Sequence, residues 1–330
     1  KTIPSRVENI APTLESLLFN QTMPFDKFYI TLMPHRDWKI KNNPPLVNNK
    51  KNSDLVLPRF LQSHINNGHI TLLRPEYDYG PVDKMLHALE QERMHPNCII
   101  IYLDDDVIYH PTLIENLVLK STEYPNAAIG FSGTKLRSNF RQIKHRNLKE
   151  DHHPNLFYPL SGSKTFQHDV QVDILQGFAG VVIRPRFFDY PEFLKFVQDA
   201  TQQSSGLVWK ADDFILGAYL EYRNIPQWLV SGGTNPVINK VASEIKPLHK
   251  MMHIQTLEAV FYLQQTLKIW TNLTFVDILS QPPEIVNLIN CEASGNPMFC
   301  DKDPQLANYT GAALIQEATR RIDEALSIAV

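Results

Sequence analysis

Three consecutive carboxylates, Asp104, Asp105 and Asp106, follow a short apolar run at residues 99–103. A short run rich in β-branched residues and bounded by polar ones is typical of a buried strand. Ligands of open α/β sheets bind beyond the carboxyl ends of strands, so we expect a ligand site at these acids. Adjacent carboxylates repel one another unless a cation lies between them, and oxygen ligands suit Mg²⁺ or Mn²⁺. The alternative interpretation is an acidic turn in solvent.

A second acidic pair, Asp212 and Asp213, opens a predicted helix at residues 214–223. Acids in the first turn of a helix are favoured by its dipole, so a purely structural role as a helix start is the alternative. Carboxylates here can also take a proton, while the first set holds a metal-bound phosphate. Group transfer needs that division between two acidic sets.

Helices and strands are predicted to alternate over the first part of the chain. We expect helices at residues 7–19, 82–92 and 111–120, and strands at residues 25–33, 69–73, 99–103 and 127–132. This alternation predicts an α/β fold with a mostly parallel central sheet covered by helices. We expect residues 1–3 to be the last residues of a strand.

The pattern changes after residue 133. Residues 134–170 are polar and basic, and we expect a long loop there, either a binding lid or a solvated excursion. In the predicted strand at residues 172–183, Gly177 and Gly180 indicate a bulge or the close approach of a ligand or backbone. The remaining predicted elements are a helix at 186–201, a strand at 227–230, a loop at 232–253, and helices at both ends of the segment beyond 254, the last at 312–326.

Composition excludes several function classes. The chain has 330 residues, of which 43% are hydrophobic and 20% charged, as in an ordinary globular protein. A net charge of −3 gives no case for non-specific nucleic-acid binding. No apolar run approaches the ~18–20 residues that span a bilayer. The three cysteines, Cys98, Cys291 and Cys300, show no zinc-site spacing, and the cellular compartment stays open.

Five short motifs occur in an order that resembles the GT-A fold, nucleotide-sugar-dependent glycosyltransferases with a DxD motif, of the inverting, family 2-like type. The motifs are Pro4-Ser5-Arg6, Tyr79-Gly80-Pro81-Val82-Asp83-Lys84, Tyr102-Leu103-Asp104-Asp105-Asp106-Val107, Gln176-Gly177-Phe178-Ala179-Gly180 and Asp212-Asp213-Phe214-Ile215-Leu216-Gly217. The resemblance implies a Rossmann-like domain at residues 1–253. Its nucleotide-sugar half would end near residue 133, its acceptor half would cover 134–253, and residues 254–330 would form a partly helical extension packed on or next to it.

The resemblance implies a donor site at the first acidic set. Asp106 would bind Mn²⁺ or Mg²⁺ between the two phosphates of the donor, with UDP as the favoured nucleotide. Asp104 would be a second metal ligand, and Asp104 and Asp105 would also hold the ribose and the surroundings of the metal. The other donor-binding residues would be Pro4, Ser5, Arg6, Lys84, Gly177 and Gly180. A late side chain would complete the metal or diphosphate site, with His249 preferred over His253, Lys246 and Lys250.

The resemblance also implies a base for the acceptor, which would be a carbohydrate or a glycoprotein glycan. Asp213 matches that base best and Asp212 comes next. The base would deprotonate an acceptor hydroxyl for in-line attack with inversion, although a retaining mechanism stays open. Asp83 departs from the family pattern, which commonly has a small or hydroxyl residue there, and this departure puts the role of Lys84 in question.

Other classes share parts of this pattern. A phosphatase of the haloacid dehalogenase type also places Asp-x-Asp after a buried strand, as Asp104 and Asp106 are placed, but normally after the first strand of the fold. A sugar nucleotidyltransferase would need a glycine-rich basic loop near its start, which this sequence lacks. The non-enzymatic alternative is an inactive glycan-binding module, against which the acids at both motif positions argue.

Overall fold

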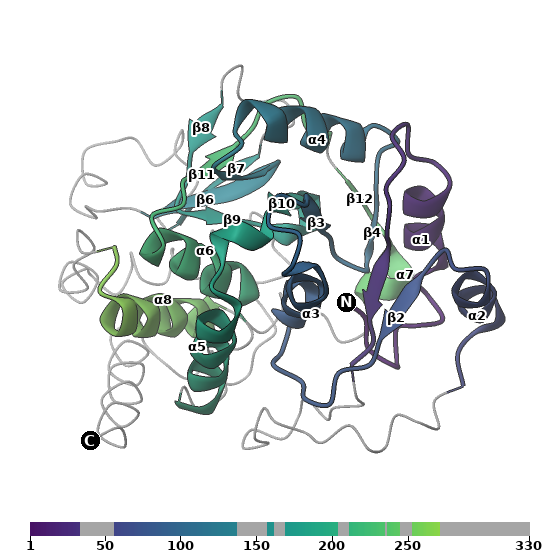
Figure 1. The fold of residues 1–330 in the computed structure, drawn as a ribbon, viewed down its shortest axis with the longest axis horizontal. Helices are drawn as coiled ribbons and strands as arrows, with labels where there is room; N and C mark the ends of the chain where they lie inside the picture. The colour runs from purple at the N-terminus through teal and green to yellow at the C-terminus, as the bar shows by residue number, and fades with distance from the viewer. Residues whose placement is uncertain are drawn as a thin grey trace, which may run out of the picture.

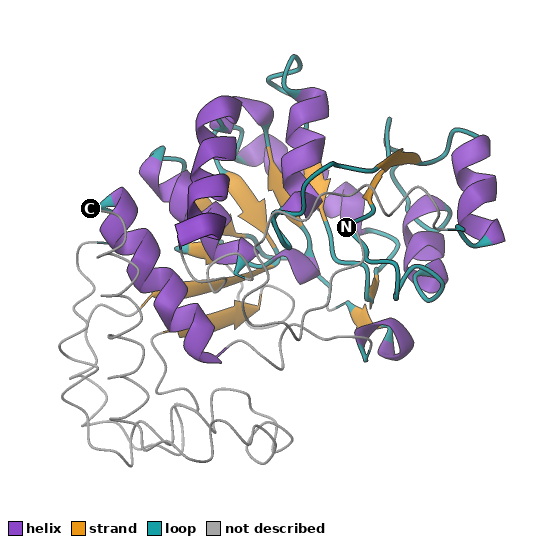
Figure 2. Cartoon of the chain, turned by 90° about the horizontal axis from the view of Figure 1, so that it is seen from below, coloured by secondary structure: helices purple, strands orange, loops and turns teal. Residues whose placement is uncertain are grey.

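The computed structural model describes residues 1–33, 56–136, 157–161, 169–203, 211–234, 236–244 and 253–270. The chain has an α/β fold in which helices cover a central mixed sheet (Figure 1, Figure 2). Five strands form that sheet in the order β3 (Ile100–Tyr102), β10 (Val181–Ile183), β5 (Ala128–Gly130), β11 (Gln227–Leu229) and β8 (Val170–Gln171). A separate parallel pair consists of β1 (Tyr29–Thr31) and β2 (Thr71–Leu73).

The expectation of a mostly parallel central sheet is wrong. Strand β10 lies between β3 and β5 and is antiparallel to both, with Val182 opposite Ile101 on one side and Ile129 on the other. Strand β11 is parallel to β5 but antiparallel to β8. The chain from Ile174 to Ile183, which ends in β10, runs back along residues 129–134, with Ile174 opposite Thr134 and Val182 opposite Ile129. Its direction is therefore reversed.

The central sheet buries both faces because alternate residues of a strand point to opposite sides. Val181 and Ile183 pack in the apolar cluster that includes α3 (Asp83–Glu92), α5 (Tyr190–Gln203), α6 (Asp212–Tyr222) and α8 (His253–Leu267). Val182 packs in the other cluster, with Leu113 and Leu117 of α4 (Leu113–Glu123). Figure 1 shows α4 and the α5–α6 pair on different sides of the sheet.

The β1–β2 pair has its own apolar cluster with α1 (Ala11–Leu18) and α2 (Arg59–Asn66). Thr2 extends this pair by a parallel bridge to Leu32, so the chain enters the fold beside β1. A cavity of about 740 Å³ lies between β1 and β3, with Asp104 and Asp105 among the residues that line it. No helix in the described part of the chain is both long and apolar enough to span a membrane.

Three other predicted segments differ from the structure. The expected loop at 134–170 contains strand residues, because β6 (Ser132–Leu136) pairs with β7 (Phe157–Ser161) and with β9 (Ile174–Leu175). The expected strand at 172–183 is broken into β9, a 3₁₀ turn at Gly177–Ala179 and β10. The expected loop at 232–253 includes β12 (Val237–Ile238), which pairs with β4 (Val107–Ile108), and α7 (Lys240–Ser243).

Two predictions cannot be compared with the fold. The predicted helix at 312–326 lies outside the described residues, as do the basic residues from 137 to 149.

The predicted helix at 186–201 is present in shifted form, since α5 begins at Tyr190 after a 3₁₀ turn at Pro185–Phe187. Proline at the start of that turn and the extended backbone of Phe188 delay the helix.

Candidate functional site

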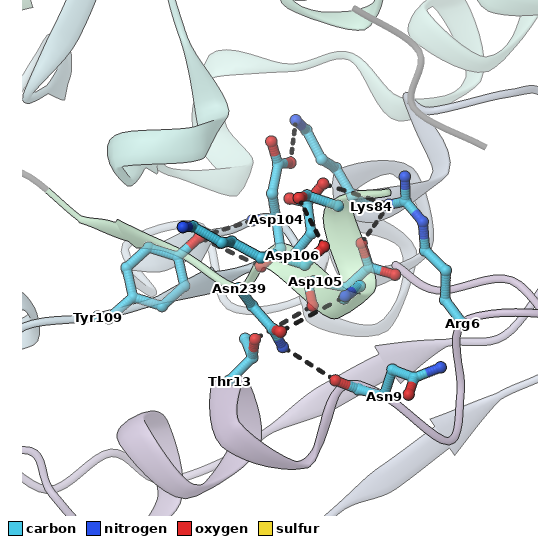
Figure 3. Close-up of polar contacts among 12 residues, drawn as sticks. Arg6, Asn9, Thr13, Lys84, Asp104, Asp105, Asp106, Tyr109 and Asn239 are labelled. Atoms are coloured by element: carbon cyan, nitrogen blue, oxygen red, sulfur yellow. Dashed lines mark hydrogen bonds and ion pairs between the residues drawn. The ribbon is translucent and has the colours of Figure 1, made fainter. Parts of the chain in front are cut away.

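The acidic turn is the name we give to Asp104, Asp105 and Asp106, which join β3 to β4 (Figure 3). Its backbone is held by side chains and backbone from three other places in the fold. The hydroxyl of Tyr109 accepts a 2.9 Å hydrogen bond from the Asp104 amide and donates a 3.2 Å one to the Asp104 carbonyl. Thr13 donates to the Asp105 carbonyl at 3.1 Å. These hydrogen bonds fix the backbone of the turn and so restrict the positions of its carboxylates.

The third contact of the acidic turn comes from Asn239, whose amide donates to the Asp106 carbonyl at 2.8 Å. The Asn239 side chain accepts from the Ala242 amide, capping α7, and donates to the Asn9 carbonyl at 2.9 Å. Sequence reasoning missed Thr13, Tyr109 and Asn239. The only available signal was an asparagine before a short helix, which predicts a cap and not a distant partner.

Arg6 reaches the acidic turn from the turn that follows Thr2 (Figure 3). Its Nη1 lies 2.8 Å from Oδ1 of Asp105 and 3.5 Å from Oδ2 of Asp106. Pro4 and Ser5 belong to the same turn, where Ser5 is exposed. The structure thus places Arg6 beside the acids, where it forms ion pairs with them.

Lys84 brings the two acidic sets together. It stands in the first turn of α3, and its side chain is only 7% exposed. The Nζ atom lies 2.9 Å from Oδ1 of Asp104, 2.7 Å from Oδ2 of Asp212 and 3.6 Å from Oδ1 of Asp213. Residues that lie far apart in the sequence therefore share one ammonium group.

The charges around Lys84 shift several pKa values. Burial alone would lower the pKa of Lys84, but the carboxylates of Asp104, Asp212 and Asp213 raise it well above its usual value. Burial would raise the pKa of Asp104, but the Lys84 ammonium overcomes that effect and lowers it. Lys84 is therefore a permanent cation and Asp104 a permanent anion near neutral pH.

Two carboxyl groups of the site have raised pKa values. Burial raises the pKa of Asp213 to about 7 against the opposing effect of Lys84, and the charges of Asp212 and Asp104 add to the rise. Burial also raises the pKa of Asp106 to about 6, together with the charges of Asp104 and Asp105 and against that of Arg6. An additional cation near Asp106 would relieve this excess of negative charge.

The glycines of the 176–180 motif allow close approach, but to side chains of this protein. A Cβ atom on Gly177 would collide with Nζ of Lys84 and would lie 2.7 Å from a ring carbon of Tyr102. The Gly177 amide donates a 3.1 Å hydrogen bond to Oδ1 of Asp213. Gly180 has a positive φ of 92°, and its Cβ would contact Leu103, Leu113 and Leu117. Gly177 thus belongs to the acidic site, whereas Gly180 serves packing against α4.

The contacts of Asp83 explain why an acidic residue occupies this position. Its carboxylate is fully buried, accepts from the Tyr79 amide at 2.9 Å, and lies 3.2 Å from Nε2 of His87 and 3.6 Å from Nζ of Lys1. Burial raises its pKa. The side chain is therefore engaged at the base of α3, while the neighbouring Lys84 points to the acidic turn.

The donor set of the acidic turn fits a hard divalent cation through oxygen ligands. Within the described residues, no group of three or more acidic, histidine or cysteine side chains is arranged so that it could hold a metal ion by itself. Sites for Mg²⁺ commonly use one or two carboxylates and complete the shell with substrate phosphates and water. Asp106, whose side chain is 21% exposed, fits that role. His249, Lys246 and Lys250 lie outside the described residues, and His253 is the first residue of α8.

No protein-family model matches the chain, and a comparison with curated proteins finds no match. The fold and the site define an α/β protein with a paired acidic site beyond the end of β3, at the edge of a mixed sheet.

Proposed function

We propose that this protein is a metal-dependent glycosyltransferase that moves a sugar from a nucleoside diphosphate sugar to a hydroxyl of a carbohydrate or glycoprotein acceptor, with inversion. The observation that carries the proposal is the meeting of Asp104 with Asp212 and Asp213 around Lys84. A transferase needs a diphosphate site and a base within the reach of one sugar, and these two acidic sets supply both.

The donor side of the proposed site combines anionic and cationic groups. A divalent ion bound at Asp106 would neutralise the charge that develops on the leaving diphosphate. Arg6 supports diphosphate binding because a guanidinium makes paired hydrogen bonds to phosphate oxygens, and it lies within 3.5 Å of Asp106. UDP is the favoured nucleotide.

The acceptor side of the proposed site rests on Asp213. A base works best when its pKa lies near the working pH, and burial and neighbouring acids raise the pKa of Asp213 to about 7. The Gly177 amide fixes one oxygen of this carboxylate at 3.1 Å. In the proposed step Asp213 takes the proton of the acceptor hydroxyl. The oxygen of that hydroxyl attacks the anomeric carbon, and the bond from this carbon to the nucleoside diphosphate breaks.

The test is calorimetric titration with nucleoside diphosphates and UDP-sugars, each with Mn²⁺ and with a chelator. Metal-dependent binding of one nucleotide is expected for the wild type, and Asp106→Asn should weaken it at least tenfold. Asp199→Asn is the matched control, because Asp199 pairs with Lys195 on the surface of α5. If no nucleotide binds in any combination, the proposal is wrong, and phosphate release from p-nitrophenyl phosphate then tests the phosphatase alternative.

A further inference from the structure

Lys84 occupies the centre of the acidic site in the way that a bound cation would. Its ammonium lies within 3 Å of one oxygen from each acidic set, on Asp104 and on Asp212. Its side chain is almost completely buried, so these carboxylates replace the water that would otherwise surround the charge. The contacts are short and come from two elements, the acidic turn and α6.

The structure also provides a shaped space for this ammonium. Gly177 provides this space, because a Cβ atom at that position would collide with Nζ of Lys84. The ring of Tyr102 forms another wall, with its centroid 5.1 Å from Nζ, a distance that allows a cation–π attraction. Lys84 is thus held on several sides, and its position is a built feature of the site.

We propose that Lys84 is an internal counter-ion of Asp104 that a divalent cation must displace, so that Lys84 lowers the cation affinity of the free protein. This inference rests on the proposed function, which supplies the cation. Oxygen ligands approach Mg²⁺ at about 2 Å, and Oδ1 of Asp104 lies 2.9 Å from the ammonium of Lys84, whose charge has the same sign as that of the cation. A divalent cation bound to this carboxylate would repel the ammonium of Lys84, so we expect Lys84 to move away from Asp104 when the cation binds.

The displacement has a direction set by the other two carboxylates. Lys84 already lies 2.7 Å from Asp212 and 3.6 Å from Asp213, so both can keep its charge compensated after it leaves Asp104. Arg6 pairs with Asp105 and Asp106, which both belong to the acidic turn. Occupation of the donor side is thereby transmitted to the proposed base by one side chain.

The experiment is a calorimetric titration with MnCl₂ alone, without nucleotide. Lys84→Gln should bind Mn²⁺ about tenfold more tightly than the wild type, and Lys84→Arg, which keeps the charge, should not. Lys120→Gln is the matched control, since Lys120 also has two acidic partners, Asp169 and Glu123, at the end of α4. A folded Lys84→Gln protein with wild-type or weaker affinity overturns the inference.

A second measurement uses the wild type and covers the case in which Lys84→Gln does not fold. The charge of a bound cation and the loss of the Asp104 contact both favour the neutral amine, which is the form that acetic anhydride acylates. Brief acetylation, read by mass spectrometry, should therefore label Lys84 several-fold more at saturating Mn²⁺, with Lys120 as the internal reference. Unchanged labelling of Lys84 overturns the inference.

The outcomes separate this inference from the proposed function. If Mn²⁺ alone binds neither the wild type nor Lys84→Gln, the inference fails, whereas the proposed function is decided separately by the titration with nucleotide and Mn²⁺ together. If Mn²⁺ binds both equally, or leaves the labelling unchanged, only the role of Lys84 fails. Measurable binding to Lys84→Gln alone supports the inference in its strongest form.

Discussion

The backbone amide of Asn239 donates a 2.8 Å hydrogen bond to the carbonyl oxygen of Asp106. This bond fastens a late segment of the chain to the turn that carries the proposed metal ligand (Figure 3). The strand β12 reinforces the connection by pairing with β4, directly after that turn. The position of the acidic turn therefore depends on residues that come after the strands of the central sheet in the sequence.

Replacement of Asn239 should destabilise the protein through its side chain. Asn239→Ala removes the cap of α7 and the hydrogen bond to the Asn9 carbonyl, both at a buried position, so we expect a loss of about 1–3 kcal/mol in the free energy of unfolding. Urea unfolding measures the loss, with Gln62→Ala on the exposed face of α2 as the control. A change within about 0.5 kcal/mol would contradict the assignment.

A side chain at Gly177 should disturb both the core and the acidic site. In Gly177→Ala the new methyl group meets the ammonium of Lys84 and the ring of Tyr102, and we expect a cost of about 1–3 kcal/mol. Gly68→Ala is the matched control, because Gly68 has a positive φ of 74° but open space around it. The control should lose only about 1 kcal/mol, which is the backbone strain. Equal losses in thermal unfolding would show that the contact is unimportant.

Stability should fall in acid partly through Asp169. Its carboxylate accepts hydrogen bonds from the Ser231 amide and hydroxyl, both at 2.7 Å, and from Tyr124 at 2.8 Å, and it pairs with Lys120 at 3.1 Å. Although burial acts against them, these contacts lower the pKa of Asp169 to about 2. Because the folded pKa lies below the unfolded one, the stabilisation is complete above about pH 5 and is lost as the pH falls toward 2.

The measurement is urea unfolding of the wild type and Asp169→Asn at several pH values. At pH 6 the variant should be less stable by about 1–2 kcal/mol, after allowance for solvent screening. The difference should shrink as the pH approaches 2, where Asp169 itself becomes protonated. A difference that does not change with pH would refute the electrostatic explanation.

The proposed base should be separable from donor binding. Asp213→Asn keeps the shape of the side chain but cannot take a proton, so sugar transfer should fall by about 10²-fold or more while nucleotide affinity stays within a few-fold of the wild type. Asp212→Asn is the comparison, since Asp212 is the closer partner of Lys84 and not the preferred base. Unchanged transfer in Asp213→Asn would remove this residue from the mechanism.

The local part of the structure follows from the sequence. The apolar run at 99–103 is a strand that ends in the acidic turn, and the predicted helix at 82–92 is α3, Asp83–Glu92. Both depend on side chains within one element, whose periodicity a sequence displays directly. The motif order assigned Lys84, Asp104, Asp212 and Asp213 to one expected site, but it did not indicate that the three carboxylates would share the Lys84 ammonium.

The long-range part could not be predicted in this way. An apolar run such as Val181–Ile183 indicates burial on both faces but carries no information about strand direction, so the antiparallel pairing of β10 could not be predicted from it. Tyr109 and Asn239 are polar residues whose partners become neighbours only after folding. Gly177 was expected to make room for a ligand, and the room is filled by Lys84. In each case the missing information is the identity of a distant partner.

The position of β10 between β3 and β5 has a consequence for the order of folding. Strands β3 and β5 come earlier in the chain, and β10 is the strand that joins them. A chain leaving the ribosome therefore holds β3 and its acidic turn without a partner in the central sheet until the segment through Ile183 has emerged. Closing such distant pairings is slow, and unpaired strand edges favour aggregation meanwhile. Truncation just before β10 should consequently give an insoluble product, because the edges of β3 and β5 that pair with β10 would stay unpaired.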